Sequence, residues 1–415
     1  MPKVTSYRSL CVLLWTVLAS PNLPLLFGDT PTFARSYFDT LLRATVEARK
    51  QLPKVSYAGE GIGERLATGG NLYAACSRYD FVSEARARAG GLMLLREDRG
   101  NITAADAVLV GWSNLTPEKD ATLVKRLKES GAFVVGIGPP PHRGEILSYV
   151  DVHLDSSVRA PSQVEQVFGR QTYPLSSLQN LAFLWAVTGE ATAALTRRGM
   201  MPAFYESVLV PGARERNNRY GKKQLDRESA IPPVPPGQLA RNYFVELGRC
   251  FRSLRDREVA TIESVARACV EVKRRGHSIH AWLISHFPYH QPGMPGDPGF
   301  FEQLERVSGE APTTEKVEET LQSGDLFFFL GYFRRPATSY EVARRAGASI
   351  VEVIVGVGDG DEPRQGLQPD YIIRPWWPYR DALVLVPNYD IRILPSSGIV
   401  QSSIYWAVVG SMVEP

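Results

Sequence analysis

The sequence lacks the features by which membrane, zinc and disulfide-linked proteins are usually recognised. Its 415 residues include only four cysteines, and none has the paired spacing of a zinc site or a disulfide framework. Buried free thiols are the simplest interpretation of Cys76, Cys250 and Cys269. No apolar run reaches the roughly 18 residues of a membrane-spanning helix, so no membrane span is predicted. A net charge of only +3 indicates no polyanion partner, and no nucleic-acid partner is predicted.

What the chain does contain is typical of a globular protein of two domains. Hydrophobic residues make up 44% of the sequence and charged residues 22%, and the length suits two α/β domains of ordinary size. His277, His280, His286 and His290 lie close together in the sequence. The first two would face opposite sides of a strand, so we predict no metal site, and we also predict no cofactor.

The first thirty residues differ from the rest of the chain. Lys3 and Arg8 precede an apolar run, 10–19, in which Val17 and Ala19 would occupy positions −3 and −1 of a cleavage site. This pattern is typical of a secretory signal peptide within residues 1–29. The alternatives are an apolar segment that packs on the domain and a start codon chosen too far upstream. A genuine leader implies a secreted or periplasmic protein, and otherwise the prediction is a cytoplasmic one.

An internal repeat organises the remainder of the sequence. The motif P-x-S is followed by W-A-V-x-G twice, and the tryptophan follows the proline by 11 positions in both copies, from Pro174 to Trp185 and from Pro395 to Trp406. A second anchor precedes it, since Asp106 and Asp325 each open an apolar run and each has a proline 11 positions later. Two segments with the same succession of motifs indicate two copies of one folding unit.

Each copy predicts strands that are apolar on both faces and alternate with helices. The predicted strands are 72–76, 106–111, 132–137 and 150–154 in the first copy, and 279–284, 325–330, 349–355 and 371–373 in the second. Such strands are typical of a parallel sheet covered by helices on both sides, so we predict two doubly wound α/β domains in tandem. A closing amphipathic helix is expected to contain each W-A-V-x-G.

A polar and proline-rich segment separates the two copies. Residues 214–228 mix basic and acidic side chains without interleaved aromatic residues, which favours a solvated connector over a nucleic-acid patch. Residues 231–237 form a stiff, extended stretch rich in proline. We therefore predict a first domain at 30–210, a linker at 211–238 and a second domain at 239–415.

The order of elements resembles the sugar isomerase (SIS) domain, twice over. The first copy reads A-A-D-A-V-L-V-G-W-S-N-L-T-P, then a helix, then G-A-F-V-V-G-I-G; the second reads S-G-D-L-F-F-F-L-G-Y-F-R-R-P-A-T-S, a helix and G-A-S-I-V-E-V-I-V-G. The resemblance lies in layout more than in short motifs. It implies a protein that binds or isomerises phosphosugars, with ligand motifs that depart from the family pattern.

The resemblance implies ligand contacts in the turns at the carboxyl ends of the strands, where helix N-termini favour anions. In the first copy Ser113, Asn114 and Thr116 could donate to a phosphate, or could simply cap the following helix. In the second copy arginines stand where the family has hydroxyls. They could form an anion site, or they could simply be exposed to solvent. The predicted ligand residues are Cys76, Ser77, Arg78, Ser113, Asn114, Thr116, Ser285, His286, Arg334, Arg335 and Thr338.

Catalysis would need a base near one of these turns. His286, at a predicted strand end, and Glu84, after the first turn, are the candidates, and an exposed helix carboxylate explains Glu84 equally well. Two hypotheses follow. The first is a noncatalytic binding protein for a small-molecule carbohydrate derivative, either a phosphosugar or an amino sugar. The second is an aldose–ketose isomerase of sugar phosphates; self-association into a homo-oligomer is open under both.

Overall fold

The computed structural model of the chain describes residues 31–77, 79–141, 144–169, 173–221, 224–226, 230–283, 292–304, 314–332, 335–355, 367–378 and 380–413. The predicted leader therefore lies outside the described residues. Among the helices within these ranges, none is long and apolar enough to cross a membrane.

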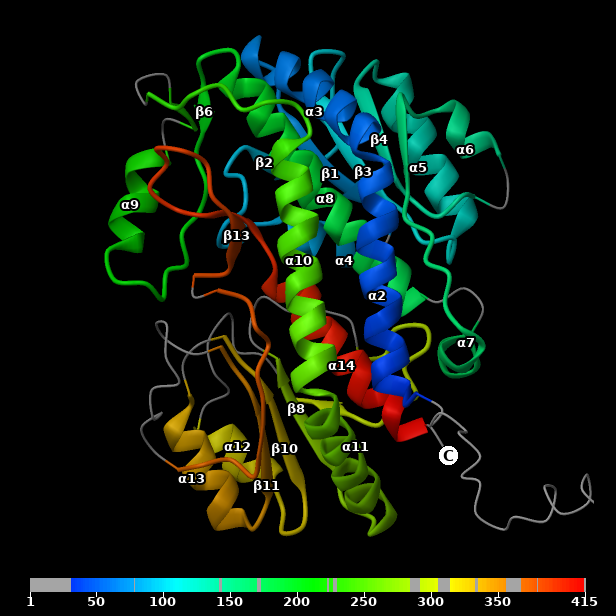
Figure 1. The fold of residues 1–415 in the computed structure, drawn as a ribbon, viewed down its shortest axis with the longest axis vertical. Helices are drawn as coiled ribbons and strands as arrows, with labels where there is room; N and C mark the ends of the chain where they lie inside the picture. Colours follow the sequence, from blue (N-terminus) through cyan, green and yellow to red (C-terminus); the bar gives the residue numbers. More distant parts are fainter. Residues whose placement is uncertain are drawn as a thin grey trace, which may run out of the picture. The chain divides into compact units, whose positions relative to one another are not determined.

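The first copy contains a five-stranded parallel sheet (Figure 1). Its strands, in spatial order, are β2 (Leu95–Glu97), β1 (Leu72–Cys76), β3 (Ala107–Gly111), β4 (Phe133–Gly138) and β5 (Val152–Asp155). Every residue of β3 and β4 is buried, as expected for central strands with helices on both faces. The order 2-1-3-4-5 is that of a doubly wound sheet.

The second copy repeats this sheet with the same topology. Its strands are β9 (Glu302–Gln303), β8 (Ile279–Leu283), β10 (Leu326–Leu330), β11 (Ser349–Val353) and β12 (Tyr371–Ile373), all parallel. The predicted fold class, two doubly wound sheets in tandem, is confirmed. The edge strands β2 and β9 were missed because they are very short and carry mainly polar residues.

Helices alternate with these strands. In the first copy they are α2 (Phe33–Lys50), α3 (Leu52–Ala67), α4 (Tyr79–Ala85), α5 (Pro117–Glu129), α6 (Glu145–Ser148), α7 (Ser162–Phe168) and α8 (Tyr173–Thr196). In the second they are α10 (Gln238–Arg257), α11 (Val259–Arg274), α12 (Thr314–Thr320), α13 (Ala337–Ala346) and α14 (Ser397–Val413). Helix α9 (Ala213–Tyr220) lies between the copies, and β6 (Met201–Pro202) pairs with β7 (Leu225–Asp226) and β13 (Ala382–Val384) with β14 (Ile393–Pro395).

The aspartates that anchor the repeat make the same hydrogen bonds in both copies. Asp106 accepts the backbone N–H of Asn71 at 2.8 Å, and Asp325 accepts that of Ser278 at 2.9 Å. Each also accepts, at 2.8 Å, the backbone N–H three residues before it. These bonds tie the amino ends of neighbouring strands together, so this anchor is structural and lies away from the carboxyl edge of the sheet.

The two copies exchange their first helices (Figure 1). Helix α2 packs on α14, the closing helix of the second copy, and α10 packs on α8, the closing helix of the first. Glycines of the W-A-V-x-G motifs lie at these crossings: a side chain at Gly410 would overlap the ring of Phe33, and one at Gly189 would contact Leu239 and Leu394. The prediction that α8 and α14 are amphipathic was wrong. Both are buried nearly all round, since the sheets cover one side and the exchanged helices the other.

The solvated connector predicted at 214–228 was also wrong in part. Arg216 in α9 is buried and donates through Nε and a terminal nitrogen to the Asp390 carboxylate, both at 2.7 Å. It also donates to the carbonyl of Phe204 at 2.8 Å. Charge in this segment therefore fixes α9 to the second copy, and the sequence alone gave no sign of the partner. The domain boundaries stay predictions.

Replacing Gly410 with alanine tests the helix exchange. Alanine is the better helix former by about 1 kcal/mol, so propensity alone predicts stabilisation. Because a Cβ atom there would overlap Phe33, we expect instead a loss of roughly 2 kcal/mol in the free energy of unfolding, measured by urea denaturation. Gly144→Ala is the control, since nothing lies within 4 Å of its Cβ position. A stabilised Gly410→Ala would contradict the crossing.

Candidate functional site

The turn at the carboxyl ends of β1 and β3 holds an internal carboxylate. The hydroxyls of Ser77 and Thr116 lie 2.9 Å apart, and both hydrogen-bond to Asp120 Oδ1, Thr116 at 3.5 Å. Asp120 is in the first turn of α5 and only 2% exposed. An anion is favoured at a helix N-terminus, and here the chain's own aspartate takes that role. The hydroxyls predicted to bind a phosphate are thus already engaged.

Asn114 shapes the rest of this turn. It has a left-handed backbone, with φ of 60°, and its Nδ2 donates to the carbonyl of Pro140 at 2.9 Å. Its Oδ1 is buried without a hydrogen-bond partner in the described part of the chain. Ser113 and Cys76 are half-buried beside it, and Thr116, at the N-cap, makes no side-chain cap bond. Arg78 lies outside the described residues.

The indole of Trp112 covers the end of β4. Its Nε1 donates to the carbonyl of Pro139 at 2.8 Å, and its rings stack on His153 with centroids 5.4 Å apart. A Cβ atom at Gly136 or Gly138 would overlap this indole, so the two glycines make room for it. Trp112 therefore fills part of the space beside the turn.

The turn at the carboxyl end of β10 also holds an internal carboxylate. Arg335 grips Glu352 of β11 with two nitrogens, at 2.7 and 3.2 Å, and Tyr340 Oη donates to the same carboxylate at 3.0 Å. The Arg335 side chain is 4% exposed and that of Glu352 is fully buried, so the interpretation of Arg335 as an exposed arginine was wrong. Thr338 is exposed in the first turn of α13. Ser285, His286 and Arg334 lie outside the described residues.

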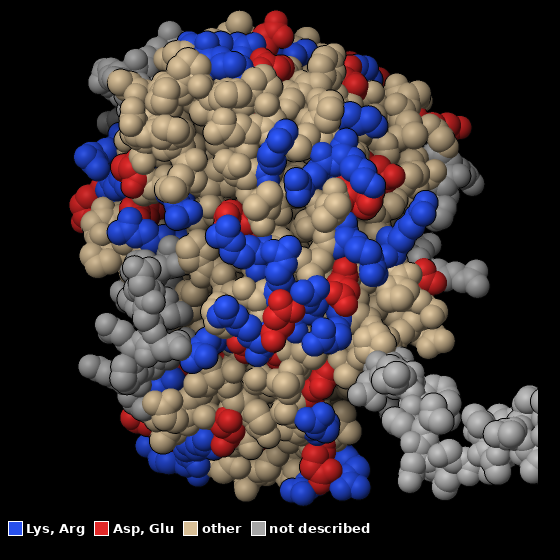
Figure 2. Space-filling model, viewed as in Figure 1, with Lys and Arg blue, Asp and Glu red and all other residues tan. Residues whose placement is uncertain are grey.

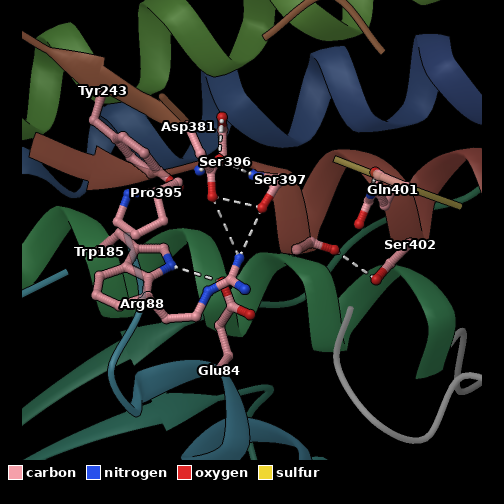
Figure 3. A network of polar contacts seen from close by, with 12 residues as sticks. Glu84, Arg88, Trp185, Tyr243, Asp381, Pro395, Ser396, Ser397, Gln401 and Ser402 are labelled. Atoms are coloured by element: carbon pink, nitrogen blue, oxygen red, sulfur yellow. Dashed lines mark hydrogen bonds and ion pairs between the residues drawn. The ribbon is translucent and has the colours of Figure 1, made fainter. Parts of the chain in front are cut away.

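Glu84 belongs to a buried polar network that joins the two copies (Figure 3). Its side chain is 1% exposed, so the interpretation of Glu84 as an exposed helix carboxylate was wrong. Glu84 Oε1 lies 3.3 Å from Nε of Arg88, which follows the end of α4, and accepts a hydrogen bond from Trp185 Nε1 at 3.2 Å. Gly398 of α14 leaves room for this carboxylate, because a Cβ atom there would overlap it.

Arg88 links this carboxylate to a second one. It donates to Ser397 Oγ at 2.9 Å and lies 3.7 Å from Asp381 Oδ2. Asp381 accepts the backbone N–H groups of Ser396 and Ser397, at 3.1 and 2.6 Å. Two carboxylates thus share one guanidinium out of contact with water.

Burial decides the protonation of this network. It raises the pKa of Glu84 to about 7, against the opposing attraction of Arg88, and it also raises the pKa of Asp381. A proton on Glu84 would leave one positive and one negative charge in the interior. Glu84 therefore exchanges a proton near neutral pH, yet no solvent reaches it to make it a general base for a bound substrate.

Metal ligands do not converge anywhere in the described ranges. No group of three or more His, Cys, Asp or Glu side chains within them is arranged to hold a metal ion. His280 lies instead 3.4 Å from Asp325 and 3.8 Å from Glu302, at the amino end of β8.

Comparison with known proteins rests on structure alone, since no protein-family model and no curated protein sequence matches this chain. The fold superposes on that of a Salmonella typhimurium LT2 protein provisionally named a sugar binding protein, with a TM-score of 0.50 and 12% identity over 91% of this chain and 99% of that one. The chain therefore shares the fold of that protein, with two five-stranded parallel sheets in tandem. The C-terminal domain of glucosamine-fructose-6-phosphate aminotransferase from Francisella tularensis is similar at a TM-score of 0.46 and 8% identity, over 90% and 94% of the chains.

Sequence reasoning located the turns at the strand ends and missed the carboxylates that occupy them. Asp120 and Glu352 gave no signal, although the position of Asp120 four residues after the N-cap of α5 could have suggested an anion at the helix end. The spacing of Glu84 and Arg88 by four residues could have suggested an ion pair, although α4 ends at Ala85 and Arg88 lies in the segment after it. Asp381 could not have been found, because it lies nearly three hundred residues from Arg88 in sequence.

The buried network predicts a pH-dependent stability. The pKa of Glu84 is about 7 in the folded state against an ordinary 4.5. Protonated Glu84 therefore adds its full share to the free energy of unfolding below about pH 4.5, and this share is lost as the pH rises through about 7. Wild type should lose about 3 kcal/mol more than Glu84→Gln between about pH 4 and pH 8, in urea denaturation at each pH.

Glu319→Gln serves as the control, because Glu319 is an exposed residue of α12. It should keep the wild-type pH profile. Equal slopes for Glu84→Gln and wild type would show that Glu84 does not hold a proton in the folded state.

Proposed function

We propose that this protein binds a carbohydrate derivative without transforming it. The observation that carries the proposal is the set of acceptors in the first-copy turn. The Asp120 carboxylate accepts hydrogen bonds from the hydroxyls of Ser77 and Thr116, and Asn114, two residues before Thr116, has a buried Oδ1 without a hydrogen-bond partner in the described part of the chain. A buried acceptor without a partner is costly, and a ligand donor would satisfy it.

The chemistry of this turn favours a sugar hydroxyl or ammonium over a phosphate. Carboxylate and amide oxygens accept hydrogen bonds, while a phosphate offers mainly acceptors of its own and would be repelled by Asp120. Of the two ligands expected from the sequence, an amino sugar is therefore favoured over a phosphosugar. Cys76, Arg78 and Ser113 are the further proposed contacts in this copy.

The second-copy turn is a weaker candidate for the same ligand. Glu352 already occupies Arg335 and Tyr340, so these groups are not available to a ligand without breaking a buried ion pair. Ser285, His286, Arg334 and Thr338 remain proposed contacts there.

The burial of Glu84 supports a noncatalytic role. A general base must come within hydrogen-bond reach of the substrate proton, and Glu84 is enclosed by Arg88, Trp185 and Gly398. The fold shared with a protein named as sugar binding supports a binding role.

Sugar phosphate isomerisation is the second candidate function. It is favoured by one observation, the pKa of about 7 that burial gives to Glu84, because a base near the operating pH is the most effective. It would require the Glu84 and Arg88 network to open toward a substrate.

Thermal unfolding with a sugar panel tests the binding proposal. Glucosamine at millimolar concentration should raise the unfolding midpoint by roughly 2–4 °C, and glucose 6-phosphate should raise it less. In Asp120→Asn the midpoint shifts with glucosamine and with glucose 6-phosphate should become more alike, since this change removes the negative charge that repels phosphate. Glu118→Gln, in the same turn of α5 but exposed, should behave as wild type. No shift with any sugar would reject binding at this turn.

Proton exchange at C2 separates binder from isomerase. Incubation of a bound sugar phosphate with the protein in deuterated water should leave the C2 proton in place. Exchange that disappears in Glu84→Gln would instead establish the isomerase and reject the noncatalytic proposal.

A further inference from the structure

A large groove runs between α2 and α10, apart from the ligand turns and the buried network. Its volume is about 1260 Å³, which exceeds the roughly 300–1,000 Å³ of ordinary small-molecule sites. The two first helices form its sides, and the loop after β5 with Ser157 and Arg159 closes one end. The groove approaches the first-copy turn only at Pro140.

The groove is strongly basic, although the whole chain is nearly neutral. Seven lysine and arginine side chains line it against three acidic ones. Figure 2 shows blue side chains gathered over α10 and α2, with some red ones between them. The net charge of +3 therefore conceals a local concentration of positive charge that the sequence average does not reveal.

Most of this charge is not neutralised within the groove. Asp39 pairs with Arg255 at 2.9 Å and Glu47 with Lys50 at 2.7 Å. The other basic side chains form no ion pair with an acidic residue of the described ranges, and they are exposed: Arg43, Arg49, Lys54, Arg159 and Arg252. Like charges held close together repel one another, which a bound anion would relieve.

The spacing of these cations exceeds the reach of a single anionic group. Arg43 and Arg49 are six positions apart on α2, about 9 Å along the helix axis. Arg252 lies across the groove on α10, and Arg159 lies on the loop at one end. A ligand that engages them all must carry several anionic groups along an extended chain.

We propose that this groove binds an anionic oligosaccharide, a sugar chain that carries several sulfate, carboxylate or phosphate groups. Ser157, on the loop after β5, is exposed and can offer its hydroxyl to a sugar hydroxyl, whereas Thr40 and Gln51 are hydrogen-bonded within the chain.

Two other occupants fit less well. Single-stranded nucleic acid binds through aromatic side chains on which its bases stack, and the one aromatic residue in the lining, Phe244, is 1% exposed. A second copy of this chain would bring two basic surfaces together, which is unfavourable without a bridging anion.

Binding of heparin-derived oligosaccharides, from di- to octasaccharide, tests the proposal by isothermal titration calorimetry. Affinity should rise with chain length and fall with salt, as counterion release requires. Neutral dextran of similar length should not bind, and inorganic sulfate alone should bind far more weakly than the octasaccharide. An oligothymidylate of matched charge should bind more weakly as well.

The double variant Arg43→Gln with Arg252→Gln should weaken octasaccharide binding by at least about tenfold and make it less salt-dependent. Its matched control, Arg267→Gln with Arg345→Gln, removes the same charge from exposed positions on α11 and α13 and should bind as wild type. If the double variant fails to fold, Lys54→Gln, exposed at the groove edge, should still weaken binding severalfold.

Three results would overturn the proposal. They are equal losses in the two double variants, no dependence of affinity on chain length, and tighter binding of the oligothymidylate, which would make the groove a nucleic-acid site. Glucosamine binding at the first-copy turn should be unchanged in Arg43→Gln with Arg252→Gln. Failure of the groove proposal can therefore be told apart from failure of the proposed sugar binding at the turn.

Discussion

The exchange of first helices between the copies is the constraint on which the rest of this structure depends. Helix α2 packs on the closing helix of the second copy and α10 on that of the first, with Gly410 and Gly189 at the crossings. Neither copy can bury its closing helix without the other, so the two form one cooperative core. The W-A-V-x-G repeat is thus explained by packing: its glycine admits a crossing helix, and its tryptophan is fully buried in both copies.

The same exchange creates the two polar features that distinguish the chain. It brings the start of α14 against α4, so that Ser397 and Gly398 meet Arg88 and Glu84. It also sets α2 beside α10 and so forms the basic groove. The buried network is closed to solvent, whereas the basic groove is open to it. A buried network of charges specifies one arrangement of the copies, because any other would leave a carboxylate or a guanidinium unpaired in the interior.

Sequence patterns predicted the fold well because the sheet depends on local and repeated signals. Buried central strands are apolar runs, and the Asp106 and Asp325 anchors recur at fixed spacing, so eight of the ten sheet strands could be located. The short edge strands could not, since two or three residues carry no periodicity. The closing helices were misjudged for a related reason: a helix covered on every side has no polar face by which to recognise its orientation.

The site could be predicted only in part, because most of its contacts join residues on different elements of the fold. The turns were located from the strand ends. Whether their hydroxyl and guanidinium groups can bind a ligand depends on Asp120 and Glu352, which accept hydrogen bonds from these groups in the folded chain. Glu84 looked like an exposed carboxylate because Trp185 and Gly398 approach it from other elements. The same reasoning applies to the groove. Arg43 and Arg252 are unremarkable on their own helices, and a nearly neutral composition concealed them until the crossing of α2 and α10 brought their charges together.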